Sequence, residues 1–526
     1  MGMRDLGFNR GDHIQMESLG ISEEQVKAQI QIFRKPLFFV RLHRPCTLGD
    51  GIQQISSGDL EHYVQLHEEA AQEGRFIKFV PASGAASRMF KLLFEIYSQN
   101  PCPPIEEFRE QAGKGDQKAK DLLCFLDGIR SMALFEDLKS MVDGKGLPLE
   151  ELLEQNGWQE ILKYLLTEQG LNYGALPKGL LKFHRYPSGH RTAFEEHLVE
   201  AIHTVRDRRG VCCVHFTVSP EHEEGFRQYC ERIRSWYEQE YQCLLEVTFS
   251  IQKHSTDTVA VDLENRPFRE KDGRLLFRPG GHGALLFNLA DIEGDLIYVK
   301  NIDNILPDRL RGPTIIWKKV LGGLLVEIQK NVNGYVRQLT ESSKDKGLFE
   351  RAMDFAKNRL LIPEPHGFKQ WTVEKKRGFL VNRLNRPLRV CGMVRNEGEL
   401  GGGPFWVEGK DGNLSLQIVE SAEVDSQSSE QQGIWGSSTH FNPVDLVCAV
   451  RDFRGNLFHL KDYVNPEAVF ISQKSKDGRD LKSLELPGLW NGAMAEWVTL
   501  FVEVPITTFN PVKTINDLLK SEHQSG

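Results

Sequence analysis

The sequence contains no uninterrupted apolar run of roughly 18–20 residues, the length that a membrane-spanning helix needs. Its first residues lack the apolar segment of a secretory signal peptide. It has no CxxC pair either, and its nine cysteines are scattered, which favours reduced thiols over a disulfide framework or a metal centre. These absences predict a cytoplasmic protein with no membrane partner.

An excess of positive charge is also missing. The formal net charge is -8 at pH 7, whereas proteins that bind nucleic acid non-specifically present a basic face. We therefore expect no nucleic-acid partner. A nucleotide pocket is still compatible with this composition, because such a pocket needs positive charge only locally. No internal repeat is visible in the sequence.

The pattern of apolar residues favours an α/β fold. Val211–Val218 is a nearly continuous apolar run, which is typical of a strand buried on both faces of a parallel sheet. A charged segment with helical character, Glu221–Glu240, and a second strand, Leu244–Ser250, follow it. With 526 residues, the chain has room for three or four domains, or for one large α/β core with insertions.

Three regions are expected along the chain. They are a helical N-terminal cap over 1–75, a core over 76–465 with helical insertions near 95–171 and 310–360, and a C-terminal segment over 466–526. Helices are predicted at Ser22–Phe33 and Leu60–Gln72 in the cap, and near Ala493–Phe501 in the last segment. The stretch Ser426–Ser438 is rich in serine, glutamine and glycine, which predicts a mobile loop.

The stretch Phe76–Lys91 combines a strand, a loop of small residues and a helix. Phe76–Val80 has β propensity, Ala82–Ser87 are all small, and apolar residues recur at helical spacing after Arg88. The backbone N–H groups of such a loop can approach a phosphate closely, and Arg88 can meet the same anion. The alternative is that any α/β protein needs small residues between a strand and a helix.

Two other loops could take part in the same chemistry. Asp303 follows the apolar strand Leu296–Val299, where a carboxylate could hold Mg²⁺ against a triphosphate; the alternative is a plain Asx turn. Pro279–Gly283 could lay its backbone against a base or a sugar, with His282 on a phosphate or hydroxyl; the alternative is a flexible surface turn with a structural histidine. The lysines that could neutralise phosphates, although most lysines are simply solvated, are Lys178, Lys182 and Lys513.

The order of these pieces resembles the UDP-sugar pyrophosphorylases, both those for UDP-N-acetylglucosamine and those for UDP-glucose. The motifs are PASGAASRM, PKG, FSIQKH, PGGHG, KNIDNIL and NPVKTINDLL, and the resemblance covers Phe76–Leu519 with insertions. It implies a GT-A-like, Rossmann-type nucleotidyltransferase core with a mixed, mainly parallel sheet. The chain also resembles an uncharacterised bacterial family of the same superfamily.

The resemblance implies a role for each matching residue. The residues that would hold the triphosphate are Ala82, Ser83, Gly84 and Ala85, and the residues that would act in catalysis are Arg88, Lys178 and Lys513. The residues that would bind the base and adjoining nucleotide are Gln252, Gly281 and His282, and those that would bind the sugar are Gly283, Gly392 and Glu420. The metal ligands would be Asp303 and, less clearly matched, Asn442. Lys178 follows Arg88 by about ninety residues, so a helical insertion must leave the site and return.

The expected function is therefore nucleotidyl transfer. A nucleoside triphosphate, with UTP as the expected one, and a sugar 1-phosphate would give a nucleotide sugar and pyrophosphate with the help of Mg²⁺. One alternative is a glycosyltransferase on the same core. The other is a nucleotide-binding or scaffold protein with a decayed site, since the loop lacks the family's pair of adjacent glycines.

Overall fold

The computed structural model describes residues 7–84, 86–99, 103–341, 347–398 and 401–524. It is a mixed α/β structure whose central strands are mainly parallel. The chain forms two compact units, each of them discontinuous in sequence. Unit 1 comprises Met1–Ile77, Ile251–Val299 and Lys319–Ile506, and unit 2 comprises Lys78–Ser250, Lys300–Lys318 and Thr507–Gly526.

Unit 2 contains a strand pair that matches the predicted buried strands. β4 (Phe76–Pro81), whose first two residues belong to unit 1, pairs in parallel with β7 (Val211–Val218). Six of the eight residues of β7 are buried. This agrees with a strand whose two faces are both apolar and both covered by other parts of the protein. The remaining strands of the unit are β5 (Lys182–Tyr186), β6 (Gly189–Thr192) and β8 (Leu244–Ile251), whose last residue belongs to unit 1.

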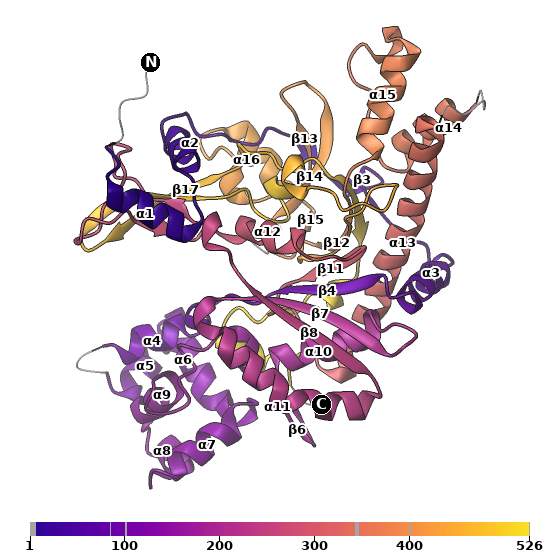
Figure 1. Ribbon diagram of the computed structural model, residues 1–526. Coiled ribbons are helices and arrows are strands. Elements are labelled where there is room, and N and C mark those ends of the chain that lie inside the picture. The colour runs from indigo at the N-terminus through magenta and orange to yellow at the C-terminus, as the bar shows by residue number, and fades with distance from the viewer. Residues whose placement is uncertain (1–6, 85, 100–102, 342–346, 399–400, 525–526) are drawn as a thin grey trace. The chain divides into compact units, whose positions relative to one another are not determined.

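The helices of unit 2 include the predicted helical insertion between the small-residue loop and Lys178. Figure 1 shows its members gathered in one group. They are α4 (Lys91–Tyr97), α5 (Ile105–Gly113), α6 (Gln117–Gly128), α7 (Phe135–Asp143), α8 (Leu149–Glu154) and α9 (Trp158–Leu166). Two longer helices follow, α10 (Ala193–Thr204) and α11 (Glu223–Tyr241).

Unit 1 is built on a second set of strands. β12 (Leu388–Arg395) pairs in parallel with β19 (Val498–Glu503) and antiparallel with β15 (His440–Phe441) and β16 (Asp445–Ala449). The other strands are β1 (Leu42–Pro45), β2 (Thr47–Leu48), β3 (Gly51–Gln53), β9 (Thr258–Val259), β10 (Phe277–Arg278), β11 (Leu296–Lys300), β13 (Gly403–Glu408), β14 (Leu414–Val419), β17 (Phe470–Lys476) and β18 (Arg479–Glu485). The last residue of β11, Lys300, already belongs to unit 2.

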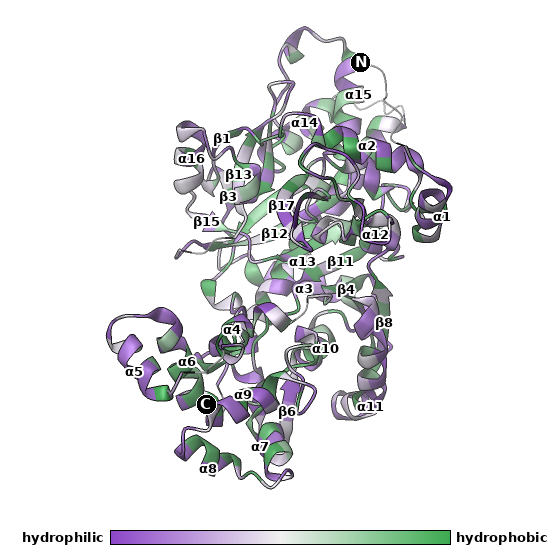
Figure 2. Cartoon of the chain, turned by 90° about the vertical axis from the view of Figure 1, so that its left-hand side faces the viewer, coloured by the Kyte–Doolittle hydropathy of each residue, from purple (hydrophilic) through white to green (hydrophobic). Residues whose placement is uncertain are grey.

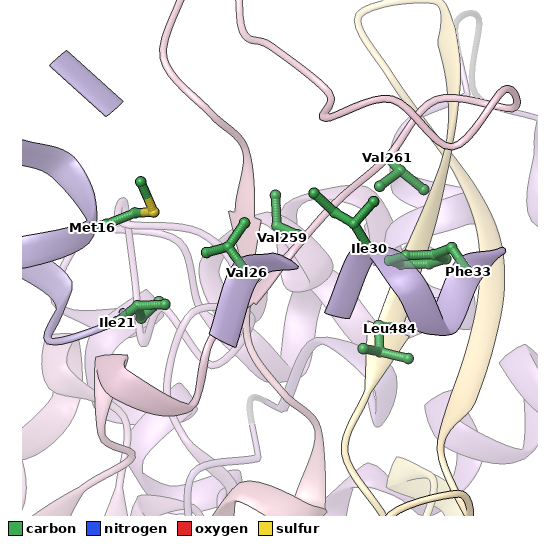
Figure 3. Packing of buried hydrophobic residues seen from close by; sticks show 8 residues of the cluster. All are labelled: Met16, Ile21, Val26, Ile30, Phe33, Val259, Val261 and Leu484. Atoms are coloured by element: carbon green, nitrogen blue, oxygen red, sulfur yellow. The ribbon is translucent and has the colours of Figure 1, made fainter. Parts of the chain in front are cut away.

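The N-terminal helices of unit 1 form where the sequence predicts them. In α2 (Glu23–Phe33), Ser22 makes a capping box with Gln25. Figure 3 shows its buried face, Val26, Ile30 and Phe33, against Val259, Val261 and Leu484. The other helices of the unit are α1 (Arg10–Leu19), α3 (Leu60–Gln72), α12 (Leu285–Ala290), α14 (Leu348–Asn358), α15 (Val373–Leu384) and α16 (Ser429–Gly436), and α13 (Asp308–Thr340) begins in unit 2 and ends in unit 1.

The distribution of hydropathy follows this arrangement. Figure 2 colours β12 mostly hydrophobic and α1 mostly hydrophilic, in agreement with the burial of all but one residue of β12. Among the helices of the described residues, none is both long enough and apolar enough to cross a membrane.

Two local predictions are wrong. In place of the helix expected near Ala493–Phe501, Gly492–Met494 form a short 3-10 turn and Val498–Glu503 form the strand β19, whose β-branched and aromatic residues are buried beside β12. The mobile loop expected at Ser426–Ser438 contains the helix α16, because Ser428 accepts a hydrogen bond from the Gln431 N–H and caps the first turn. The N-terminal region also supplies three short strands, β1, β2 and β3, beside its helices.

Candidate functional site

The small-residue loop lies in unit 2, directly after β4. Its two ends are held, since the Ala82 N–H donates to Thr217 O at 2.7 Å and the Ala86 N–H donates to Leu176 O at 3.1 Å. Between them, the N–H groups of Ser83 and Gly84 have no acceptor among the residues that the structure describes. Ala85, also predicted to hold the triphosphate, lies outside the described residues.

Arg88 ends the 3-10 turn Ala86–Arg88 that follows this loop. Its side chain is exposed and makes no ion pair or hydrogen bond within the described part of the chain. An exposed arginine that closely follows a loop with unpaired backbone N–H groups could contact the same anion as that loop, such as a phosphate.

Lys178 returns to this loop after the helical insertion. Its backbone N–H donates to Gly84 O at 3.3 Å, so the predicted return of the chain to the loop is confirmed. Its Nζ donates to Asp303 Oδ2 at 2.7 Å and to Val512 O at 2.8 Å. The Lys178 side chain is 12% exposed and that of Asp303 is 23% exposed, so the pair is partly shielded from water.

The C-terminal motif joins the same place. The Val512 N–H donates to Asp303 O at 3.0 Å, and the Asn510 N–H donates to Asn304 Oδ1 at 3.0 Å. Lys513 is exposed, and its Nζ lies 5.9 Å from the centre of the Phe509 ring. Three segments predicted to contact phosphates and the segment of the predicted metal ligand Asp303 therefore meet within unit 2, although they are far apart in sequence.

The turn that carries Asp303 is anchored by a buried polar face of α10. His197 Nε2 donates to Ile302 O at 3.2 Å, and Lys300 Nζ contacts Glu200 Oε2 at 2.6 Å. Glu200 also contacts Lys78 at 2.8 Å and Lys318 at 3.5 Å. Although burial raises the pKa of Glu200, the three lysines together hold it well below its usual range. The glutamate is thus charged and fixes the end of β11, directly before Asp303.

A second cluster lies in unit 1, around His282 and Glu420. The Trp490 Nε1–H donates to Glu420 Oε1 at 3.0 Å, and the ring of His282 lies 4.4 Å from the Trp490 ring. His282 Nε2 is 3.6 Å from Glu420 Oε1. Two residues predicted to bind base and sugar are therefore neighbours. Both side chains are about a quarter exposed, at 26% and 28%.

The protonation state of this cluster follows from its contacts. Burial lowers the pKa of His282 to about 4, so its ring is neutral at pH 7. Since Nδ1 accepts a hydrogen bond from the Leu489 N–H at 3.2 Å, the proton is assigned to Nε2. Burial raises the pKa of Glu420, and a hydrogen bond from Trp490 opposes this shift. The pair offers one N–H donor and one carboxyl group to a polar ligand such as a sugar.

The glycines of the PGGHG loop are required by packing. Gly281 has φ +72, which L side chains rarely adopt, and a Cβ at Gly283 would lie 2.2 Å from Pro487 O. The Leu486 N–H donates to Gly280 O at 2.9 Å. The loop is thus packed against the Leu486–Gly488 segment, so the alternative of a flexible surface turn is wrong.

Three other residues of unit 1 were predicted to bind nucleotide, sugar or metal, and each has its own set of neighbours. Gln252 is half-buried directly after β8. Gly392 lies inside β12, where a Cβ would approach Val504 to 3.2 Å, so close packing alone accounts for a glycine there. Asn442 is 5% exposed, and its Oδ1 accepts a hydrogen bond from the Val444 N–H at 3.1 Å.

Few side chains near the loop could act as ligands of Mg²⁺. Within the described ranges, no group of three or more acidic, histidine or cysteine side chains converges in a way that could hold a metal ion. Asp303 alone offers a partly exposed carboxylate beside the loop. This fits a Mg²⁺ ion that takes most of its ligands from phosphate oxygens and water, and does not fit a metal site made by the protein alone.

Several residues of these clusters were not predicted. Trp490 donates a hydrogen bond to Glu420, and Asn491 donates one to Glu423. In the sequence, these two residues are marked only by their place between a Pro-Gly pair and a further glycine, in PGLWNG. The sequence did not predict the buried positions of His197 and Glu200, because the polar face of a helix is normally exposed to solvent.

A family model described as "Domain of unknown function (DUF4301)" matches residues 9–524. A search of curated proteins gave no match. Among solved structures, the chain is similar to the UDP-N-acetylglucosamine pyrophosphorylase of Trypanosoma brucei, with 12% identity, 98% of this chain and 80% of that chain covered, and a TM-score of 0.48. It is also similar to the UDP-glucose pyrophosphorylase of Leishmania major, with 12% identity, the same coverage of 98% and 80%, and a TM-score of 0.45.

Proposed function

Since the chain belongs to the DUF4301 family, we propose from the chemistry of its site that it is a nucleotidyltransferase. It would form a nucleotide sugar and pyrophosphate from a nucleoside triphosphate and a sugar 1-phosphate. We expect the triphosphate to be UTP. One observation carries this proposal. The small-residue loop, Lys178, Asp303 and the Lys513 segment meet in unit 2, with Lys178 Nζ 2.7 Å from Asp303.

The charges at this place suit a polyphosphate. Arg88, Lys178 and Lys513 supply three cations, and Asp303 supplies one carboxylate. The loop adds the N–H groups of Ser83 and Gly84. Such an arrangement attracts an anion with several charges, and the partial shielding of Lys178 strengthens each contact because the local dielectric is lower.

The reaction needs no protein nucleophile. An oxygen of the sugar phosphate attacks the α-phosphorus of the triphosphate, the bond between that phosphorus and the α–β bridging oxygen breaks, and pyrophosphate leaves with the electron pair. The work of the protein is to position the reactants and to neutralise charge. Arg88 and the loop would hold the β- and γ-phosphates, whereas Lys178 and Lys513 would stabilise charge on the α-phosphate and the attacking sugar phosphate.

Asp303 would hold Mg²⁺ together with phosphate oxygens, and the ion would neutralise charge on the phosphates when bound. Lys178 Nζ donates to Asp303 at 2.7 Å and balances its charge, so the ammonium group is held where it could also contact a phosphate.

Unit 1 offers the groups for base and sugar. The Nε2–H of His282 and the carboxyl group of Glu420 are a donor and an acceptor for sugar hydroxyls, and Gln252 has an amide that could pair with the edge of a base. The resemblance to the UDP-sugar pyrophosphorylases assigns the same roles to these residues.

The test is pyrophosphate release by the purified full-length chain. UTP and Mg²⁺ are supplied with glucose 1-phosphate or with N-acetylglucosamine 1-phosphate in separate reactions. We expect release with at least one of them, and a loss on the order of 10²–10³ in Asp303→Ala. Asp137→Ala is the matched control, since Asp137 also pairs with a lysine, Lys182, at 2.7 Å in the same unit.

The outcomes separate the alternatives. Turnover by Asp303→Ala at the wild-type rate would remove Asp303 from the mechanism. Release of a nucleotide from a nucleotide sugar, without pyrophosphate release from UTP, would indicate a glycosyltransferase. Binding of UTP without turnover of either sugar phosphate would favour a decayed, nucleotide-binding scaffold.

A further inference from the structure

A cavity of about 700 Å³ lies within unit 1. Its wall is formed by the turn end of the β13–β14 hairpin, by the segments Phe38–Arg41 and Leu360–Pro363, and by residues just before β12 and at the start of β19. This volume is in the range of cavities that hold small molecules.

The residues that line the cavity do not include those of the His282–Glu420 cluster in the same unit. It takes Arg383 and Arg386 from just before β12 and Trp497 from just before β19, which places it at the amino ends of these two parallel strands. Glu420 follows β14 at the end of the hairpin away from the turn. Ligands of open α/β sheets bind at the carboxyl ends of the strands, so the nucleotide hypothesis does not account for this cavity.

One cation in the wall has hydrogen-bond donors without acceptors. The Arg383 side chain is 27% exposed and forms no hydrogen bond with any described residue. Its nearest carboxylate, Glu496, is 3.8 Å away and already binds Arg386. The Arg383 guanidinium therefore has N–H groups left for a ligand that accepts hydrogen bonds. Trp497, which is 5% exposed, forms part of the same wall.

The carboxylates of the wall are already engaged. Glu408 binds Arg41, and Glu467 binds Lys410. Asp411 accepts hydrogen bonds from the side chain and the N–H of Asn413. Burial and the neighbouring Arg386 lower the pKa of Arg383, whereas Glu496 and Asp411 oppose this shift. An anion placed beside the guanidinium would relieve this unfavourable environment.

Another part of the wall is apolar, and one residue there has a strained backbone. Phe38, Leu360, Ile362 and Leu416 contribute apolar surface. Leu361, at the same place, has φ +54, a conformation that is rare for a leucine. Backbone strain of this kind persists only where the surroundings impose it and is concentrated at functional sites.

We propose that this cavity binds a small molecule with an oxyanion head, a carboxylate or a phosphate, on an apolar body. The oxyanion accepts hydrogen bonds from Arg383, and the apolar body packs on Phe38, Leu360 and Ile362 in the cavity that Trp497 also lines. The site is independent of the proposed nucleotidyl transfer, and its test does not use enzymatic activity.

The test uses the full-length chain with its eight tryptophans replaced by 5-fluorotryptophan. Trp497→Phe identifies the ¹⁹F resonance of Trp497. The probes are 3-phenylpropionate, phenyl phosphate and the uncharged 3-phenylpropionamide. We expect one or both anions to shift the Trp497 resonance in a saturable way and the amide to leave it unchanged. A response to only one anion tells carboxylate from phosphate.

Arg383→Gln is expected to weaken the binding of the anion about tenfold or more, which corresponds to the loss of a charge-assisted hydrogen bond. Arg454→Gln, a change in unit 1 outside the cavity, is the control. The proposal is overturned if neither anion shifts the resonance, or if the amide binds as well as the anions in the wild-type chain. Unchanged affinity in a folded Arg383→Gln chain also overturns it.

Discussion

Lys178 and Lys182 lie close together in the sequence, and each binds an aspartate at 2.7 Å, yet we expect only Lys178 to matter for activity. Lys178 also contacts the C-terminal motif through Val512 O. In the pyrophosphate assay, Lys178→Met should lower the rate on the order of 10²–10³, because it removes a cation from the reacting phosphates. Lys182→Met should leave the rate within about twofold, since the Lys182–Asp137 pair makes no contact with the C-terminal motif within the described residues and, at 27% and 37% exposed, is more open to water than the Lys178–Asp303 pair. Equal losses in both variants would contradict the assigned role.

Glu423 supports a second prediction at the scale of one residue. It is 6% exposed, accepts hydrogen bonds from Asn491 and from the Glu420 N–H, and burial raises its pKa to about 7. A raised carboxyl pKa contributes stability that is complete below the unfolded value of 4.5 and is lost as the pH rises through 7.

Glu423→Gln should therefore gain stability relative to the wild type as the pH rises from 4.5 to above 7. The difference is on the order of 3 kcal/mol at most. Urea unfolding at several pH values measures it, with the exposed Glu430→Gln as the control. A difference between wild type and Glu423→Gln that does not change with pH would show that Glu423 titrates normally.

At the scale of elements, β4 and α10 share a buried charged cluster that supports the Asp303 turn. Burial lowers the pKa of Lys78 to about 7, Glu200 opposes this shift, and Lys318 and Lys300 add to it. Between about pH 7 and the unfolded value of 10.5, the unfolded chain binds more protons at this position than the folded chain. The contribution of Lys78 to stability therefore rises with pH across this interval.

Lys78→Met removes this dependence, and Glu200 keeps Lys300 at 2.6 Å as its partner. We expect the stability of the wild type relative to Lys78→Met to rise between pH 7 and 10 by on the order of 1 kcal/mol or more. Denaturant titrations of both chains measure the difference, with the exposed Lys91→Met as the control. A relative stability that falls over this interval would contradict the assignment.

At the scale of the whole molecule, binding of a nucleotide should appear as a change in thermal stability. A ligand that binds only the folded state stabilises it by about 2.7 kcal/mol at a hundredfold excess over Kd. We expect UTP with Mg²⁺ to raise Tm more than the other nucleoside triphosphates do, and Gln252→Ala to remove this preference. If no triphosphate changes Tm, the site is closed or serves another ligand.

Much of the local structure could be predicted from the sequence, and so could several of the segments that come together in the candidate site. The apolar run of β7, the capped helix α2 and the loop after β4 all depend on residues that are neighbours in the chain, and each is present as expected. The same local reasoning failed for β19, because its place beside β12 outweighs its local pattern.

The partners of the charged groups were decided only by the tertiary structure. Lys178 meets Asp303 across 125 positions of sequence, and Glu420 meets Trp490 across 70. Burial of Glu200 among three lysines likewise depends on how α10 packs. The physical reason is that periodicity and capping act over one or two turns of chain, whereas desolvation and ion pairing depend on which distant segments exclude water from a group.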